Sequence, residues 1–204
     1  MSASRSQAEA PLAREAVAAA LSAALLRPAD AAALEVHGRD DSAVLVPLFI
    51  RGDELHVVLT RRRDDLRRHA GEISFPGGRR DDCDADLCVT ALREAHEEVG
   101  IPPEAVELVG ALQPTPTIAT SYAIYPFVGL IEPDFAWERS EREVAEVLEL
   151  PLADLRAGHT RRRMLRRGVP FRTDVYVAGE TLIWGATARM LGDLLDRTPL
   201  DLGR

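Results

Sequence analysis

The chain has 204 residues, of which 46% are hydrophobic, so it is long enough to bury one substantial core and we expect one main domain. Its formal net charge of −8 argues against general binding to nucleic acids or to anionic membranes. Cys83 and Cys88 are too few for a disulfide scaffold, and no apolar run approaches the roughly 20 residues that span a bilayer, so we predict a cytoplasmic protein.

The N-terminal part of the chain, residues 1–40, is predicted to hold a disordered tail and one amphipathic helix, ahead of a domain over residues 41–204. The tail covers residues 1–10. The helix is predicted from Pro11 to Leu26, where the sequence RPAD ends it.

The domain opens with two strand-like runs, Ser42–Ile50 and Glu54–Thr60, and the sequence RGD between them is typical of a hairpin. A charged stretch and the short strand ISFPGG lead to a helix predicted over residues 85–99. Residues 140–155 mix a helical spacing of acids with a strand-like end. The remaining predicted elements are strands over 106–112, 122–131, 171–179 and 181–185 and a helix over 186–198. This order predicts an α+β fold, with a mixed sheet and helices packed on both faces.

The helix over residues 85–99 carries an unusual cluster of acids. Glu94, Glu97 and Glu98 are spaced i, i+3 and i+4 just before Gly100, so they repel one another and lie at the unfavourable end of the helix dipole. A divalent cation turns this repulsion into attraction, and the Gly77–Gly78 loop lets backbone carbonyls and amides approach the same ion or a phosphate. We therefore predict a Mg²⁺ or Mn²⁺ site, whereas the helix taken alone would be read as a solvated acidic face.

These residues resemble the box of the Nudix hydrolases, G-x5-E-x7-R-E-U-x-E-E-x-G-U, in which U is a bulky apolar residue. The matching positions are Arg93, Glu94, Glu97, Glu98, Gly100 and Ile101. Small Ala95 stands at the first U, and Asp84 stands where the box has its first glutamate. Eight residues instead of seven separate Asp84 from Arg93, so the role of Asp84 is left open.

The stretch LTRRRDDLRRHAGEISFPGG, from Leu59 to Gly78, resembles the segment that marks the coenzyme A pyrophosphatase subgroup of this family. The positions in register are Thr60, Arg62, Leu66, Arg67, Gly71 and Phe75–Gly78, and Arg63 replaces the usual serine. The resemblance covers about residues 40–197. It implies a Nudix-type α/β/α sandwich with a loop-helix-loop metal site, and hydrolysis of the diphosphate bond of coenzyme A or its acyl derivatives to adenosine 3′,5′-bisphosphate and 4′-phosphopantetheine.

The resemblance also implies roles for individual residues. Glu94, Glu97 and Glu98 would ligate the ion together with Gly78, and Arg93 would orient the carboxylates. One of the three glutamates or an acid from outside the box would act as the base. For the outside acid we select Glu146, with Glu143 as a second candidate and a solvated helix face as the alternative for both.

Two arginine clusters stand out in this acidic chain, and guanidinium groups bind phosphate in a bidentate fashion. In the first cluster, residues 61–68, we expect Arg62 and Arg67 to contact substrate together with the Gly77–Gly78 backbone, the alternative being a salt-bridged surface. The second cluster, residues 161–167, is expected to be a mobile basic loop that meets the acids of a partner subunit.

Two other functions stay open at this point. One is a Nudix pyrophosphatase acting on NADH, ADP-ribose or a nucleoside triphosphate, and the other is a catalytically silent Nudix domain that senses a nucleotide. In each case we expect a small-molecule ligand and neither nucleic acid nor membrane as a partner, and a homodimer is left open.

Overall fold

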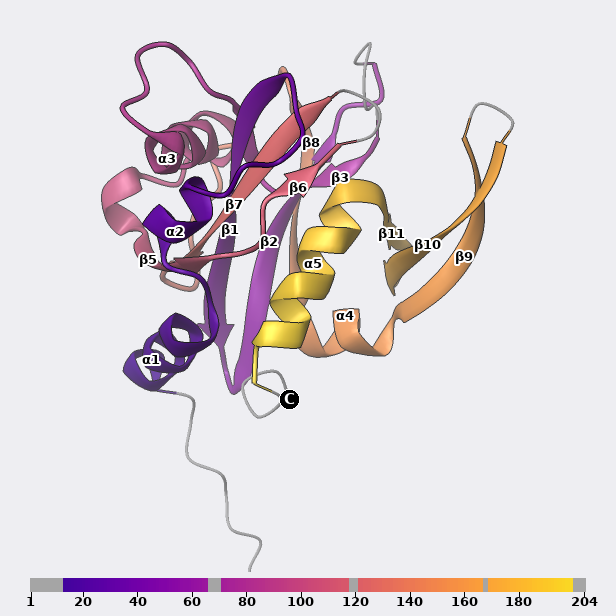
Figure 1. Ribbon diagram of the computed structural model, residues 1–204. Coiled ribbons are helices and arrows are strands. Elements are labelled where there is room, and N and C mark those ends of the chain that lie inside the picture. Colours follow the sequence, from indigo (N-terminus) through magenta and orange to yellow (C-terminus); the bar gives the residue numbers. More distant parts are fainter. Residues whose placement is uncertain (1–12, 66–70, 118–120, 167–168, 200–204) are drawn as a thin grey trace, which may run out of the picture.

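The structure is a computed structural model, and it describes residues 13–65, 71–117, 121–166 and 169–199 (Figure 1). Five α-helices and a 3₁₀ turn are described: α1 (Arg14–Ala24), α2 (Pro28–Ala32), α3 (Leu87–Val99), η1 (Pro103–Ala105), α4 (Leu152–Ala157) and α5 (Gly185–Arg197). The described strands are β1 (Asp40–Arg51), β2 (Glu54–Arg62), β3 (Ile73–Ser74), β4 (Gly77–Arg79), β5 (Glu107–Ala111), β6 (Thr115–Pro116), β7 (Tyr122–Leu130), β8 (Val144–Pro151), β9 (His159–Arg166), β10 (Val169–Ala178) and β11 (Thr181–Ile183).

The central sheet is mixed, as the sequence predicts. Its main path runs β3-β2-β1-β7-β5, and β4, β6 and β8 pair with β1, β7 and β2 respectively. Strands β1 and β7 are parallel, in register from Asp40 opposite Tyr122 to Leu48 opposite Leu130, and the other pairs are antiparallel. Because β1 lies in the middle of the sheet, its side chains are buried on both faces.

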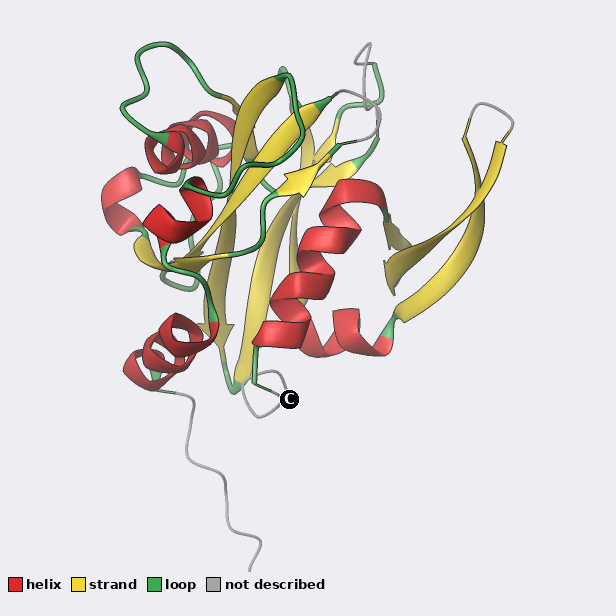
Figure 2. Cartoon of the chain, in the orientation of Figure 1, coloured by secondary structure: helices red, strands yellow, loops and turns green. Residues whose placement is uncertain are grey.

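Two apolar clusters cover the two faces of this sheet. Val44 and Val46 of β1 pack with side chains from α1 and α5, whereas Leu45 and Phe49 pack with side chains from α3. Figure 2 shows the same layers, with α3 on one side of the strands and α5 on the other. The α/β/α sandwich is therefore confirmed, and it presents α3 as the only long helix described on its face.

The predicted N-terminal helix is confirmed as α1, although it begins at Arg14 instead of Pro11. Val17 and Leu21 of α1 are fully buried in the first cluster. The tail over residues 1–10 lies outside the described residues. No helix in the described part of the chain has the length and apolar character needed to cross a bilayer.

The second arginine cluster was expected to be a loop, and this expectation is wrong for its described part. Arg161, Arg162 and Arg163 lie in β9, which pairs with β10 from His159 opposite Tyr176 outward. The strands β9, β10 and β11 form a small separate sheet, and Figure 1 shows the β9–β10 hairpin curving away from the body. The strand conformation of Arg161–Arg163 comes from antiparallel pairing with β10, and the polar composition of these residues does not predict it.

Candidate active site

The helix α3 has well-defined ends, which fix where its acids lie. Asp86 caps the N-terminus, with its Oδ1 accepting a hydrogen bond from the amide of Val89 at 2.9 Å. Gly100 ends the helix in the left-handed conformation, with φ of 79°, and its amide donates to the His96 carbonyl. The predicted helix and its glycine stop are therefore confirmed.

One face of α3 is buried on the sheet through Ala91, Ala95 and Val99, all fully buried. The acids occupy the rest of the helix surface but not equally. The side chains of Glu94 and Glu98 are 18% and 6% exposed, and that of Glu97 is 57% exposed. Glu94 and Glu98, one turn apart, therefore form the inner part of the cluster, with Glu97 at its solvent edge.

The glycine loop lies directly against these two carboxylates. A Cβ atom added at Gly78 would lie 2.4 Å from Glu94 Cδ and 2.5 Å from both its carboxylate oxygens. The amide of Gly77 donates to Glu98 Oε2 at 3.3 Å, and the carbonyl of Gly78 accepts a hydrogen bond from Ser42 Oγ at 2.5 Å. Residue 78 must therefore lack a side chain for Glu94 to occupy this position.

Burial makes the charged forms of the two inner carboxylates, Glu94 and Glu98, unfavourable. Glu98 is 4% exposed, and its burial raises the pKa of its carboxyl to about 8, despite the Gly77 amide and the attraction of Arg62. The negative charges of Glu143 and Glu94 raise the pKa of Glu98 further. Burial also raises the pKa of Glu94, although Arg93 opposes this shift. A divalent cation with oxygen ligands would relieve both effects.

Arg93 connects the acids of α3 to the loop before it. Its Nε and Nη2 each donate to the carboxylate of Asp84 at 2.9 Å, in a bidentate pair. Its Nη1 donates to Glu94 at 3.0 Å and to Glu97 at 3.3 Å, and its Nη2 also reaches the carbonyl of Arg79. Arg93 thus forms hydrogen bonds with two of the three glutamates.

Asp84, whose role the sequence left open, is the buried anchor of Arg93. Its hydrogen bonds from Arg93 hold the pKa of the Asp84 carboxyl well below its usual range, although burial opposes the shift. Its Oδ2 also accepts from Thr90 Oγ1 at 2.9 Å and from the Asp81 amide at 3.0 Å. Thr90 was missed in the sequence, although its position three residues before Arg93 places both on one face of the helix.

Of the two predicted substrate arginines, only one can be placed. Arg62 lies at the inner carboxylates, with Nη1 3.8 Å from Glu98 Oε1 and Nη2 4.0 Å from Glu143 Oε2. Its Nε is buried and has no hydrogen-bond partner within the described chain. Arg67 lies outside the described residues. Arg62 therefore brings an incompletely paired guanidinium to the edge of the acid cluster.

The selection of Glu146 as the outside acid needs a correction. The region is a strand, β8, and not a helix, and Glu146 lies directly opposite Arg61 of β2. Its carboxylate pairs with Arg61 Nε at 2.9 Å on the sheet face away from α3. Glu143, just before β8, is instead the acid whose charge acts on both Glu94 and Glu98.

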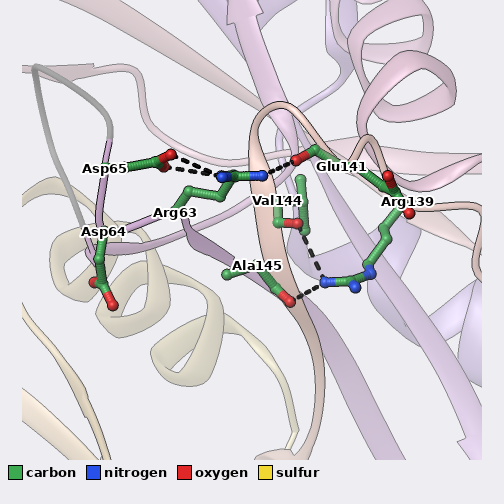
Figure 3. A pocket seen from close by; sticks show the side chains of 7 residues that line it. All are labelled: Arg63, Asp64, Asp65, Arg139, Glu141, Val144 and Ala145. Carbon is green, nitrogen blue, oxygen red and sulfur yellow. Dashed lines mark hydrogen bonds and ion pairs between the residues drawn. The ribbon is translucent and has the colours of Figure 1, made fainter.

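A pocket of about 610 Å³ lies between the segment after β2 and the segment that leads into β8 (Figure 3). Two of its lining residues, Arg63 and Val144, are the chain neighbours of Arg62 and Glu143. Figure 3 shows Arg63 held between the carboxylate of Asp65, at 2.7 Å, and the carbonyl of Glu141, at 2.5 Å. The other lining residues are Asp64, Arg139 and Ala145.

The donor set fits a hard divalent cation. Carboxylates and backbone carbonyls are the ligands that Mg²⁺ and Mn²⁺ prefer, and Cys83, the nearest thiol in the sequence to the loop, is exposed. Within the described residues, no three acidic, His or Cys side chains are already gathered as one metal-binding group. Glu94 and Glu97 instead accept hydrogen bonds from Arg93.

Comparisons with known proteins agree with this geometry. The NUDIX domain family matches residues 40–168. The uncharacterised Nudix hydrolase NudL of Cronobacter sakazakii is 45% identical over 155 residues, which cover 75% of this chain and 80% of that protein. NudL of an Enterobacter species is 41% identical over 172 residues, covering 83% of this chain and 88% of its own.

Among solved structures, a MutT/nudix family protein from Enterococcus faecalis is similar in fold, with a TM-score of 0.53. Its sequence is 17% identical, and the match covers 78% of this chain and 62% of that one. The family match, the two relatives and the buried carboxylate helix lead to one conclusion: the chain belongs to the Nudix hydrolase family, a family of pyrophosphohydrolases.

Proposed function

We propose that this protein hydrolyses the diphosphate bond of coenzyme A, or of its acyl derivatives, with Mg²⁺ or Mn²⁺ as cofactor. The products would be adenosine 3′,5′-bisphosphate and 4′-phosphopantetheine or its acyl form. The resemblance of Leu59–Gly78 to the coenzyme A pyrophosphatase segment supports the choice of substrate. The acid cluster on α3 supports the reaction type.

The observation that carries this proposal is the state of Glu98. A carboxylate that is 4% exposed and pushed towards a pKa of about 8 is costly to keep charged at neutral pH. The attraction of a bound cation would offset this cost. Glu94, Glu97, Glu98 and the Gly78 carbonyl would hold Mg²⁺ or Mn²⁺, which when bound neutralises charge on the diphosphate and lowers the pKa of a water molecule.

The side chains around the ion would position the reactants. Arg93, anchored on Asp84, keeps Glu94 and Glu97 oriented before the substrate arrives. Glu143, 52% exposed at the edge of the cluster, would accept a proton from the attacking water. The water oxygen then bonds to one phosphorus, the bridging P–O bond breaks, and the departing phosphate keeps the bridging oxygen.

Arg62 would bind the substrate's phosphates. Its buried Nε has no hydrogen-bond partner among the described residues, and its Nη atoms lie 3.8 and 4.0 Å from carboxylates, longer than a hydrogen bond. A phosphate oxygen would complete this pairing. The pocket beside Arg63 falls within the size range of ligand sites and has room for a further part of a large nucleotide.

The test is a substrate comparison. The protein is incubated with coenzyme A, 3′-dephospho-coenzyme A, NADH, ADP-ribose and nucleoside triphosphates, each with Mg²⁺ or Mn²⁺, and the products are identified by mass. We expect preference for coenzyme A and release of the 3′,5′-bisphosphate. Glu98→Gln should lower turnover by about 100-fold or more while the circular dichroism spectrum is unchanged.

The outcomes separate the parts of the proposal. Preference for NADH, ADP-ribose or a triphosphate would reject coenzyme A but keep the site. Wild-type rates in Glu98→Gln would reject the metal-ligand role of Glu98. Equal turnover of coenzyme A and its 3′-dephospho form would mean that the arginines do not recognise the 3′-phosphate.

A further inference from the structure

The β9–β10 hairpin, residues 159–178, is called the arm here because it leaves the body of the protein. At its base Val175 and Tyr176 are buried, and His159 stacks on Tyr176 with ring centroids 5.0 Å apart. Farther out, Arg161, Arg162 and Arg163 are all exposed. An isolated two-stranded ribbon is at best marginally stable in water, so the outer half of the arm gains from a partner that covers it.

The register of the arm creates a repulsion that no described residue relieves. Arg163 lies directly opposite Arg172, so their side chains share one face of the ribbon. Among the described residues, neither of them forms a side-chain hydrogen bond or ion pair, nor does Arg162 on the other face. Only Arg161, nearer the base, has an acid within reach, Asp174 at 3.6 Å. Like charges directly opposite one another destabilise a hairpin, so the outer arm calls for an external anion.

An apolar contact point lies beyond these arginines. Leu165, opposite Pro170, is 75% exposed, against 40% and 41% for Leu34 and Val89, the other large hydrophobic side chains described as exposed. A single exposed leucine is unremarkable on a surface. Together with the unpaired arginines of the arm, Leu165 forms a surface of the kind found in interfaces, where charged residues surround an apolar contact.

The complementary charge is present on the same chain. The arm contains six arginines and one aspartate, a formal charge of +5, so the rest of the chain carries −13 and the sum is the net charge of −8. The rest of a second copy of the chain therefore has a net charge opposite to that of the arm. The same −13 would repel a nucleic acid long enough to extend past the arm, which disfavours a polynucleotide as the partner.

The manner of pairing follows from the same charges. The edge of β9 is unpaired in the small sheet, and two β9 edges could in principle join across a two-fold axis. That arrangement would bring the arginines of both copies together, so charge rejects it. We propose that each arm docks on the body of a second copy through the face that carries Arg163, Leu165 and Arg172, and that the two copies exchange arms in this way to form a two-fold dimer.

The test is sedimentation equilibrium of the full chain at micromolar concentrations. We expect a dimer at about 50 mM NaCl that dissociates at about 500 mM, because screening shortens the reach of exposed charges. Arg163→Glu should weaken the dimer about tenfold or more. Arg163→Lys keeps the charge and should dimerise like the wild type. Arg27→Glu is a second control, because Arg27 is an arginine at the N-cap of α2, outside the arm, with a side chain that is 82% exposed. This variant should also dimerise like the wild type.

Thermal melting by circular dichroism checks that Arg163→Glu is folded, and Leu165→Ser gives a second variant that leaves the charge unchanged and should also weaken the dimer. A wild-type protein that stays monomeric at every salt concentration would overturn the proposal. So would a dimer that Arg163→Glu and Leu165→Ser leave intact, since another surface would then form it. A monomer that binds a labelled oligonucleotide through Arg163 would assign the arm to a polyanion instead.

Discussion

Arg93 shows how one side chain can organise several charges. A guanidinium has five N–H donors in a planar fork, and Arg93 uses them on Asp84, Glu94, Glu97 and the Arg79 carbonyl. A lysine at this position could not hold Asp84 in two hydrogen bonds and still reach two glutamates. The geometry of the acids therefore depends on the anchor behind them, and that anchor is testable.

We predict that Asp84→Asn costs about 3 kcal/mol of unfolding free energy at pH 7, because it removes one partner of a mostly buried ion pair. The pKa of Asp84 in the folded protein lies below its ordinary value. Its contribution is therefore complete above about pH 5 and is lost as the pH falls below about 4, the pKa of an unfolded aspartate. Urea titrations without divalent ions, at several pH values, measure the difference between wild type and variant.

The difference should shrink from pH 7 to pH 3. A difference that is constant over this range would mean that the charge of Asp84 does not stabilise the fold. Asp82→Asn is the matched control, since Asp82 lies in the same loop but is exposed. This control should change stability by less than about 0.5 kcal/mol at any of these pH values.

At the scale of elements, an irregularity in β8 decides which acid faces α3. Glu146 lies opposite Arg61, but Val144 lies opposite Arg62, so Ala145 is an extra residue in the strand. Because side chains alternate between faces, this extra residue changes which positions share a face with Arg62. Glu146, two residues before Leu148, follows the regular alternation and faces away from α3, whereas the extra residue changes the faces of the residues before it, and Glu143 at the strand entrance lies near the cluster.

This arrangement gives a paired prediction. Glu143→Gln should lower the turnover number by about 100-fold, the usual size of a general-base effect, and Glu146→Gln should leave it within about twofold of wild type. The two substitutions are the same chemically and lie three residues apart. Steady-state kinetics on the best substrate compare them, and equal rates for the two variants would contradict the assignment.

The same elements show what the sequence can and cannot predict. The helix α3 was predicted because its apolar residues repeat at helical spacing and Gly100 ends it, and both signals are local. The strand β9 was missed because Arg161–Arg163 have no apolar alternation, and its conformation comes from pairing with β10. The face of Glu146 was missed because residues 140–155 were read with a helical spacing of acids, whereas β8 alternates as a strand paired with the distant β2. The anchoring role of Asp84 likewise became clear only once its contact with Arg93 was seen.

On the scale of the whole molecule, the proposed metal site at the acid cluster would link the stability of the protein to the divalent ion. A ligand that binds only the folded state stabilises it by about 2.7 kcal/mol at 100 times its dissociation constant. The carboxyl of Glu98 is buried with only the Gly77 amide at 3.3 Å and Arg62 at 3.8 Å beside it, so its charged form costs more to bury than an amide would in the metal-free protein. If Glu98 ligates the ion as proposed, ion binding and folding stability depend on the same residue.

We predict that saturating Mn²⁺ raises the melting temperature by about 5–10 °C for a chain of this length. In Glu98→Gln the increase should fall below about 2 °C, while the metal-free variant melts no lower than metal-free wild type. Differential scanning calorimetry with and without Mn²⁺ measures both quantities. An equal increase in wild type and variant would show that the ion binds elsewhere.

The spacing between Asp84 and Arg93 has a consequence for recognising related chains. An aspartate is one methylene shorter than a glutamate, and here the segment between the two partners is one residue longer than the family pattern. Side-chain reach and backbone length compensate each other, so a pattern search with fixed gaps scores two mismatches where the three-dimensional contact is intact. Searches for distant family members should therefore accept two forms of the acid–arginine pair. One has an aspartate with the longer segment, and the other has a glutamate with the shorter segment.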